Sequence, residues 1–153
     1  MNIAIAADHA GVELKRQLVR RLRADRIDVL DLGIHTTRAV DYPDCARMVA
    51  EAMLAGRSYR GILICGSAVG VSVAACKFPG IRATCAHDTY TAHQCVEHDQ
   101  VNVVCLGGRV IGPSLAGDII RAYLQAEFTG EERHERRLAK IDGIEREFLR
   151  DDV

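Results

Sequence analysis

The sequence lacks several features that mark membrane, secreted or nucleic-acid-binding proteins. None of its apolar runs approaches the ~20 residues that a bilayer-spanning helix needs. Residues 1–8 form a short apolar segment ending in an acid, without the basic region of a signal peptide. The formal net charge is only −1 at pH 7, so overall charge draws the chain neither to nucleic acid nor to an anionic membrane. We therefore expect a cytoplasmic protein that binds neither of them.

Cysteine pairs of the CxxC type are absent, although the chain has six cysteines. Disulfide frameworks belong to small, loop-rich secreted domains, so we expect reduced thiols instead. A free cysteine packs as a small hydrophobic side chain, which is the role we expect for most of them. That packing group is Cys45, Cys76, Cys85 and Cys105.

Nucleotide-binding fingerprints are missing as well. The first apolar segment is followed by Asp-His-Ala-Gly at residues 8–11 rather than by GxGxxG, and the turn over residues 66–70 lacks the third glycine of that pattern. The chain contains no P-loop. One histidine-rich segment invites a zinc interpretation, but its candidate ligands match no zinc spacing, so we expect no metal there. Those ligands are His87, His93, Cys95 and His98.

What the sequence does contain is an alternation of apolar and amphipathic segments. At 153 residues, with 48% hydrophobic and 27% charged side chains, the chain fits one domain with a substantial core. Five strands are expected, at residues 3–7, 29–32, 61–64, 81–86 and 101–106, each followed by a helix. Strands that alternate with helices form a parallel sheet with right-handed crossovers. The expected fold class is α/β, a three-layer α/β/α sandwich around a five-stranded, Rossmann-like parallel sheet with an extra C-terminal helix.

Local signals support these helices. Asp8, Asp41 and Asp88 each stand where a side chain can cap a helix N-terminus. The leucines at positions 14, 18 and 22 recur every fourth residue and predict the buried face of the first helix. The second helix should run to about residue 54, the third to 77, the fourth to 97 and the fifth to 126.

The segment from residue 132 to 150 differs from the rest because it is highly charged. Apolar side chains still recur at helical spacing, which predicts an amphipathic helix with a narrow apolar stripe. We expect residues 1–130 to form the main domain and residues 131–153 this extension. Two placements stay open: the helix packs on its own domain, or it reaches across a dimer.

Residues suited to chemistry stand at the ends of the expected strands. The apolar run over residues 61–64 stops at Cys65 and gives way to small residues, a turn whose backbone N–H groups can hold an anion. Asp8 and His9 follow the first strand at the same edge of the sheet. Just before the last strand, His98 adds an imidazole that can exchange a proton near neutral pH.

Arginines supply candidate phosphate ligands. Guanidinium groups bind phosphate in a bidentate manner, and such groups stand at Arg109, Arg133, Arg136 and Arg137. For the last three, a solvated helix face is the open alternative.

The order and spacing of these residues resemble ribose-5-phosphate isomerase type B and its relatives that act on galactose 6-phosphate and allose 6-phosphate. The resemblance covers nearly the whole chain. The matching motifs are Asp-His-Ala-Gly at 8–11, Asp-Tyr-Pro-Asp at 41–44, the Cys65 turn at 61–67, Lys-Phe-Pro-Gly-Ile-Arg-Ala at 77–83, Glu-His-Asp at 97–99, Gly-Gly-Arg-Val-Ile-Gly at 107–112, and Arg133, His134 and Arg137.

The resemblance implies an aldose–ketose isomerase that interconverts ribose 5-phosphate and ribulose 5-phosphate through a cis-enediolate, as in the pentose phosphate pathway, without a metal or organic cofactor. Cys65 would be the base that moves a proton between C1 and C2, and Ser67 with the turn amides would stabilise the enediolate oxygen. His98, aided by Asp8, would open the furanose ring. The implied substrate-binding residues are His9, Tyr42, Gly66, Gly70, Asp99, Arg109, Arg133 and Arg137.

The resemblance also implies a homodimer or a tetramer. In such an assembly the neighbouring subunit offers the His98 region and the tail arginines to the site. This expectation favours the placement in which the last helix reaches across a dimer.

Two positions depart from the family pattern. Ala68 replaces the middle glycine of the turn, so a positive φ there would be strained. Asp99 stands where asparagine is usual, and an ionised carboxylate cannot donate a hydrogen bond to a substrate oxygen. Three alternatives stay open: the same chemistry on a four- or six-carbon sugar phosphate, a non-catalytic sugar-phosphate sensor, and a thiol-transfer protein.

Overall fold

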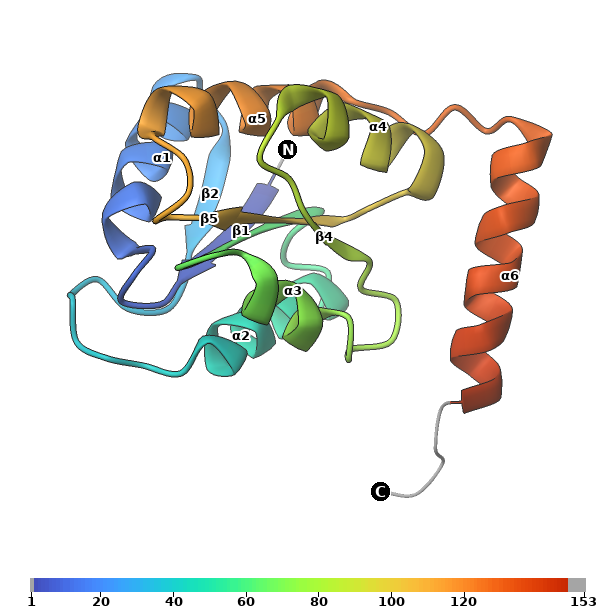
Figure 1. Cartoon of the computed structure of the whole chain (residues 1–153), viewed down its shortest axis with the longest axis horizontal. Coiled ribbons are helices and arrows are strands. Elements are labelled where there is room, and N and C mark those ends of the chain that lie inside the picture. Colours follow the sequence, from blue (N-terminus) through green and yellow to red (C-terminus); the bar gives the residue numbers. More distant parts are fainter. Residues whose placement is uncertain (1, 149–153) are drawn as a thin grey trace.

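Five parallel strands lie between two layers of helices in the computed structural model, which describes residues 2–148 (Figure 1). The strands are β1 Asn2–Ala7, β2 Asp28–Asp31, β3 Arg60–Cys65, β4 Ala83–Cys85 and β5 Val103–Gly107. Their order in the sheet is β2-β1-β3-β5-β4, and every neighbouring pair is parallel. The predicted α/β fold class is confirmed.

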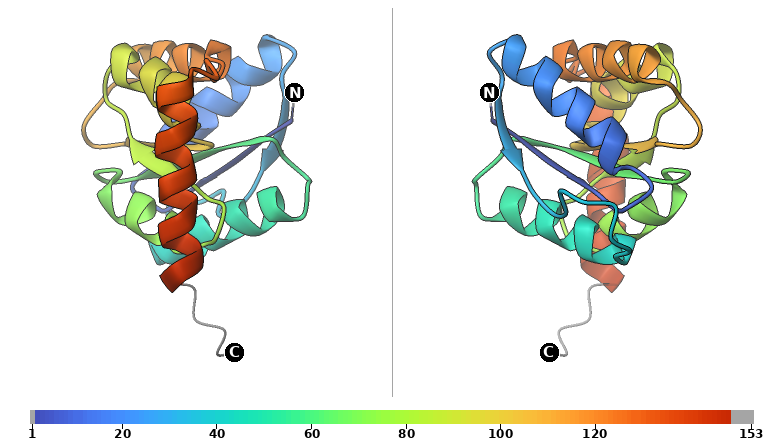
Figure 2. Two further views of the ribbon diagram at one scale, coloured as in Figure 1. Left: turned by 90° about the vertical axis from the view of Figure 1, so that its right-hand side faces the viewer. Right: turned by 90° about the vertical axis from the view of Figure 1, so that its left-hand side faces the viewer.

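The helices divide between the two faces of the sheet, as right-handed crossovers require (Figures 1 and 2). One face is covered by α1 Val12–Ala24, α4 Thr89–Asp99 and α5 Pro113–Gln125. The other is covered by α2 Tyr42–Leu54 and α3 Val69–Ala75. Because all five strands are parallel, they end at the same edge of the sheet, which we call the carboxyl edge. We call the opposite edge, at which they begin, the amino edge.

An apolar core lies on each face of the sheet. The predicted inward face of α1 is confirmed, because Leu14, Leu18 and Leu22 are only 7%, 2% and 4% exposed. Strand β3 is buried at every position, since it lies between β1 and β5 under helices on both faces. This position explains the unbroken apolar run that precedes Cys65.

Several element boundaries differ from the predictions, and β5 for example begins at residue 103 rather than 101. Strand β4 is shorter than predicted because it is an edge strand that pairs only with β5, and the N–H of Arg82 bonds to the Asn102 side chain instead (2.8 Å). Helix α3 ends two residues early, at Ala75. Helix α4 ends late, where Gln100 adopts a positive φ of 48°, so its last turn contains His98 and Asp99.

Two buried cations anchor the sheet. Lys15 of α1 donates to the Asp31 carboxylate (2.7 Å) and to the carbonyl of Leu32 (2.9 Å), which fixes the end of β2. At the start of β3, Arg60 donates to the last carbonyls of α5 and its neighbour, those of Tyr123 and Ala126. A cation at a helix C-terminus is stabilised by the helix dipole.

Helix α6, Glu132–Phe148, stands beyond the amino edge and runs across it, from the level of α4 to that of α3 (Figures 1 and 2). Its first half packs on the domain through His134 and Leu138. Farther along, Asp142 pairs with Arg82 (3.4 Å) and the Glu145 carboxylate accepts from the Gly80 N–H (3.1 Å). The rest of the predicted apolar stripe is exposed: Ile141 45%, Ile144 60% and Phe148 73%. The predicted end of this helix at residue 150 lies outside the described residues.

Within residues 2–148, no helix is both long enough and apolar enough to cross a membrane. All six cysteines are free thiols, as predicted.

Candidate active site

The carboxyl ends of β1 and β3 lie side by side, because Ala7 is the register partner of Ile64. The N–H of Asp8 extends this pairing by donating to the Ile64 carbonyl (3.1 Å). The helices that follow these two strands leave toward opposite faces of the sheet, an arrangement that opens a crevice in α/β proteins. Asp8 and Cys65 therefore meet at the edge that the sequence predicts.

Asp8 orders the turn that leads into α1. It is 6% exposed, and its Oδ1 accepts from the N–H groups of Ala10 (2.9 Å) and Gly11 (3.1 Å). The prediction that Asp8 caps the helix is wrong, because Gly11 occupies the N-cap position and the Asp8 side chain binds the turn before the helix instead. His9 is exposed, and its Nδ1 accepts from the N–H of Val40 (3.4 Å) in the loop before α2.

Backbone bonds join the Cys65 turn to the end of β5. The carbonyl of Cys65 accepts from the Gly108 N–H (2.8 Å), and that of Gly66 accepts from the Arg109 N–H (3.1 Å). A Cβ on Gly66 would lie 3.6 Å from Cδ and Nη1 of Arg109. The Arg109 side chain thus lies against the turn that follows the thiol, and Cys65 itself is 4% exposed.

The turn itself contains a strained residue. Ala68, the N-cap of α3, has φ 72° and ψ −21° and is fully buried. The positive φ that is expected to strain an alanine is therefore present, since this left-handed conformation disfavours any residue with a Cβ. Next to it Ser67 is exposed, and its Oγ is 3.4 Å from the Val69 N–H.

Tyr42 lies against Gly70 beside this turn. A Cβ on Gly70 would stand 2.8 Å from Cε2 and Cζ of the Tyr42 ring, so only glycine leaves room for it. The ring is 42% exposed. We call the residues gathered here the Cys65 group: Asp8, His9, Tyr42, Cys65, Gly66, Ser67, Gly70 and Arg109.

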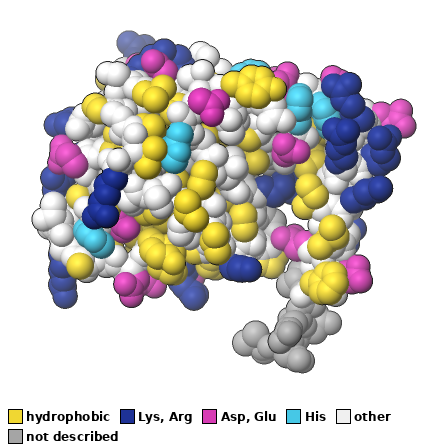
Figure 3. All heavy atoms as spheres, viewed as in Figure 1, with side chains coloured by type: hydrophobic (Ala, Val, Ile, Leu, Met, Phe, Trp, Pro, Cys, Tyr) yellow, Lys and Arg dark blue, Asp and Glu magenta, His cyan; other side chains and the backbone are white. Residues whose placement is uncertain are grey.

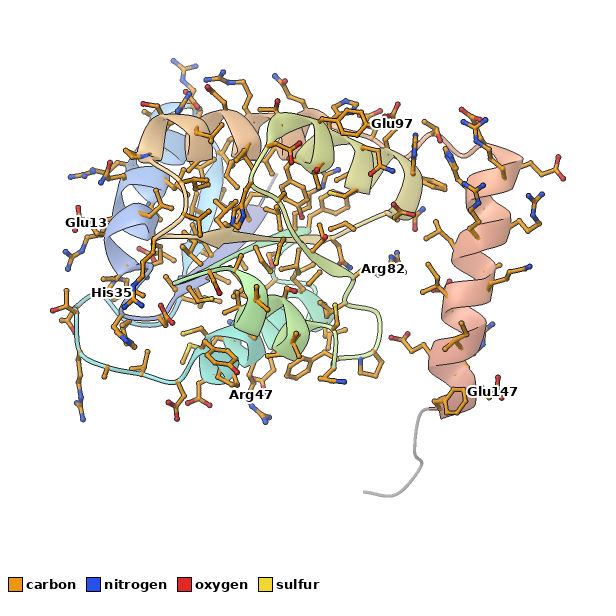
Figure 4. The ribbon with its side chains drawn as sticks, in the orientation of Figure 1. Glu13, His35, Arg47, Arg82, Glu97 and Glu147 are labelled. Carbon is orange, nitrogen blue, oxygen red and sulfur yellow. The ribbon has the colours of Figure 1, made fainter. Side chains whose placement is uncertain are left out.

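The other predicted site residues lie at the opposite edge of the sheet. His98 and Asp99 end α4, and Arg133 and Arg137 lie in the first turns of α6. Figure 4 shows Glu97, the neighbour of His98, on the side that faces α6, with His35 at the other end of the molecule. We call His98, Asp99, Arg133 and Arg137 the His98 group. One chain therefore does not bring the predicted site together.

Side chains hold the His98 group in place. His98 Nδ1 bonds to Gln94 Nε2 (2.9 Å), and its ring centroid is 4.2 Å from that of His134. Arg133 pairs with Glu131 (3.0 Å), whereas Arg137 is exposed. Lys and Arg side chains gather over α6, next to histidines, in Figure 3. The result is a positively charged surface suited to an anion.

Comparisons with known proteins identify the family. The profile described as Ribose/Galactose Isomerase matches residues 3–141. The chain belongs to this isomerase family. Ribose-5-phosphate isomerase B of Escherichia coli is 41% identical over 143 residues, which cover 94% of this chain and 95% of that protein.

Two further relatives support this assignment, and one of them is named for a different sugar phosphate. D-erythrulose-4-phosphate isomerase of Pectobacterium atrosepticum is 42% identical over 131 residues, covering 85% of this isomerase and 86% of the relative. The structure of ribose-5-phosphate isomerase B from Clostridium thermocellum superposes with a TM-score of 0.94 at 44% identity, covering 97% of this chain and 99% of that one. The resemblance seen in the sequence is confirmed.

The structure adds a residue of this isomerase to which sequence analysis assigns no role. His87 follows β4, and its Nε2 accepts from the Gly107 N–H (3.0 Å). Gly107 is the register partner of Cys65, and a Cβ on it would lie 3.0 Å from that nitrogen. The position of His87 just after a strand, as for Cys65, is the signal that could have identified it.

Three of the other thiols, Cys45, Cys95 and Cys105, are buried in the two apolar cores. Burial raises the pKa of Cys45 and of Cys95 to about 11, and it raises the pKa of Cys105 well above the ordinary value. These three are therefore protonated packing residues. The prediction is wrong for Cys76, which is exposed because it caps the end of α3, where its thiol donates to the Ala83 carbonyl (3.3 Å).

No three His, Cys, Asp or Glu side chains among residues 2–148 are arranged to hold a metal ion.

Proposed function

We propose that this isomerase interconverts ribose 5-phosphate and ribulose 5-phosphate through a cis-enediolate. The observation that carries the proposal is the position of Cys65, at the carboxyl edge beside Asp8 and hydrogen-bonded through its turn to the Arg109 segment. Relatives named ribose-5-phosphate isomerase B align with nearly the whole chain. The proposal places the enzyme in pentose phosphate metabolism.

Cys65 is the proposed base. Its thiolate takes the proton from C2 of the open-chain aldose, the freed electron pair forms the C1=C2 bond, and the carbonyl oxygen O1 becomes an oxyanion. The thiol then returns the proton to C1, while O2 loses its proton and becomes the ketose carbonyl and O1 is protonated. A positioned base of this kind contributes about 10²–10⁴-fold to the rate.

The turn after Cys65 is the proposed oxyanion site. Ser67 has an exposed hydroxyl, and the backbone N–H groups of the turn stand beside it. Donors placed where negative charge develops stabilise the enediolate more than the substrate, and losing one such donor costs about 10²–10³-fold in rate. Gly66 lets the Arg109 side chain lie against the turn, and Gly70 makes room for the Tyr42 ring, which is proposed to line the sugar pocket.

Cations from both groups are the proposed phosphate ligands. Arg109 and His9 belong to the Cys65 group, and Arg133 and Arg137 belong to the His98 group. Guanidinium groups bind phosphate through paired N–H donors, and an imidazole adds one more. Asp99 is proposed to accept from a sugar hydroxyl, because a carboxylate offers only acceptors.

His98, with Asp8, is proposed to open the furanose ring by moving a proton between the anomeric hydroxyl and the ring oxygen. His98 and Asp8 lie at opposite edges of one chain, so the proposal requires a homodimer in which each site combines the two groups from different subunits. The exposed stripe of Ile141, Ile144 and Phe148 supports a second copy as the occupant of this face of α6. Closed two-fold symmetry then creates two equal sites.

Mixing two inactive variants tests the shared site. Cys65→Ala and His98→Asn homodimers each lack one function in both sites. After subunit exchange, half of the dimers are mixed and contain one intact site, so activity should return to about a quarter of the wild-type value. If mixed dimers form but the isomerase activity does not return, a site shared between subunits is contradicted.

A four-carbon substrate is the second candidate. The Pectobacterium atrosepticum relative is named for D-erythrulose 4-phosphate and shares 42% identity with this chain. A turnover screen over four-, five- and six-carbon aldose and ketose phosphates separates the candidates by kcat/KM. The pentose assignment would be overturned if any other substrate had a kcat/KM within about tenfold of that for ribose 5-phosphate, or above it.

A further inference from the structure

A buried histidine lies between two members of the His98 group. His134, in the first turn of α6, is 1% exposed. The Arg133 Nε–H donates to its Nε2 (3.1 Å), and its ring stacks against that of His98 at a centroid distance of 4.2 Å. This imidazole has no role in the proposed reaction, although it contacts the two side chains proposed for ring opening and phosphate binding, His98 and Arg133.

The hydrogen bonds around His134 run in one direction. Since Nε2 accepts from Arg133, a neutral ring carries its proton on Nδ1, which donates to Oγ1 of Thr129 (2.8 Å). The Thr129 hydroxyl in turn donates to the carbonyl of Glu97 (3.2 Å), which also accepts from the Thr129 N–H (3.1 Å). In this series of hydrogen bonds, every donor therefore meets an acceptor only when His134 is the Nδ1–H tautomer.

The chain of bonds joins two segments that are far apart in the sequence. Its far end, the Glu97 carbonyl, adjoins His98 at the end of α4. Its near end is Arg133, at the start of α6. One imidazole thus sets the distance between the residue proposed for ring opening and a residue proposed for phosphate binding.

We propose that His134 is a positioning residue: as a neutral Nδ1–H imidazole it fixes Arg133 for phosphate binding and supports the ring of His98. This inference rests on the proposed function, because it concerns the same site. His134 does not touch the substrate in this scheme. It acts through the two side chains that do.

The charges around His134 favour the neutral ring. Burial lowers the pKa of His134, and nearby positive charge lowers it further against the opposing effect of Glu131. The positive groups are His98, Arg133 and Arg137. In acid the ring gains a proton on Nε2 and can no longer accept from Arg133. Substrate binding through Arg133 should therefore weaken as the pH falls through the titration of His134.

Three substitutions separate the contacts. His134→Gln places an amide oxygen near the Nε2 position and keeps an acceptor for Arg133, without titrating. His134→Asn keeps an amide donor for Thr129 but does not reach Arg133. His93→Asn is the matched control, since it removes an imidazole of α4 that pairs with the Glu97 side chain (3.3 Å) and is 49% exposed.

The expected result is a difference in KM for ribose 5-phosphate. His134→Asn should raise KM about tenfold with kcat changed less than about threefold, because one hydrogen bond to a charged group is lost. His134→Gln should stay within about threefold of the wild-type KM and lose the acid-side rise in KM. Equal KM values for the two variants, or a wild-type KM for His134→Asn, would overturn the proposal.

A measurement that does not depend on turnover completes the test. Nitrogen-15 NMR of the imidazoles should show His134 as the Nδ1–H tautomer at pH 7, and an Nε2–H or doubly protonated ring would contradict the proposal. If the wild-type protein isomerises no sugar phosphate, the proposed function is wrong. The spectrum still shows which ring nitrogen of His134 carries the proton, so the two failures can be told apart. If both His134 variants fail to fold, Thr129→Val replaces them: an unchanged KM with an unchanged tautomer then overturns the proposal.

Discussion

The two edges of the sheet are built by different means. At the carboxyl edge, backbone groups bond to one another: Asp8 to Ile64, Gly108 to Cys65 and Arg109 to Gly66. At the amino edge, side chains from α4 and α6 form the contacts, and two of them are imidazoles. The first arrangement follows from the fold. The second depends on protonation and on where α6 lies.

The largest test of this comparison is Cys65→Ala. The thiol is the proposed base, so its loss should lower kcat by about 10³–10⁴-fold, while the affinity for ribulose 5-phosphate measured by calorimetry should change little. The control is Cys76→Ser, because that thiol is exposed and lies outside the Cys65 group. Wild-type turnover in the Cys65→Ala variant would show that Cys65, at the carboxyl edge, is not the base.

A smaller effect is expected for His98→Asn at the amino edge. Ribose 5-phosphate closes to a furanose, whereas erythrose 4-phosphate has no free hydroxyl with which to form that ring. The variant should lose about 100-fold in kcat/KM on the first substrate and less than about threefold on the second. Equal losses on both would show that His98 does not act in ring opening.

Arg137→Ala should mainly weaken binding. One charge-assisted contact to phosphate is lost, so KM should rise about tenfold and kcat should change less than about threefold. Arg136→Ala is the matched control, because Arg136 is the exposed neighbour on the same helix and is not among the proposed phosphate ligands. If both variants raise KM equally, α6 acts as a general positive surface rather than through a specific guanidinium.

The smallest effect concerns stability at the carboxyl edge. Ala68→Gly relieves a left-handed conformation that costs alanine about 1–2 kcal/mol, but loses a buried methyl worth about 0.8 kcal/mol. The free energy of unfolding should therefore rise by at most about 1 kcal/mol, or a few degrees in Tm. Ala74→Gly, inside α3, should lower it by about 0.5–1 kcal/mol. A stability loss at residue 68 as large as at residue 74 would mean that the turn is not strained.

The amino-acid sequence predicts the carboxyl edge better than the amino edge for a physical reason. Strand ends and glycine turns are local signals, so Asp8, Cys65 and the Gly66 turn lie together as predicted. The contact between the rings of His134 and His98 joins segments far apart in the sequence, and no spacing rule reveals it. The end of α4 depends on one left-handed residue, Gln100, which propensity does not foresee.

Arg60 has a consequence for the motion of the thiol at the other end of its strand. Its guanidinium holds the start of β3 to the end of α5, while the Gly108 bond holds the end at Cys65. A buried strand fixed at both ends exposes its amides to solvent only when the whole domain opens. Hydrogen exchange along β3 should then be as slow as global unfolding allows, and any adjustment of the site during turnover should come from the substrate, the surrounding loops or α6 rather than from the strand that bears the sulfur.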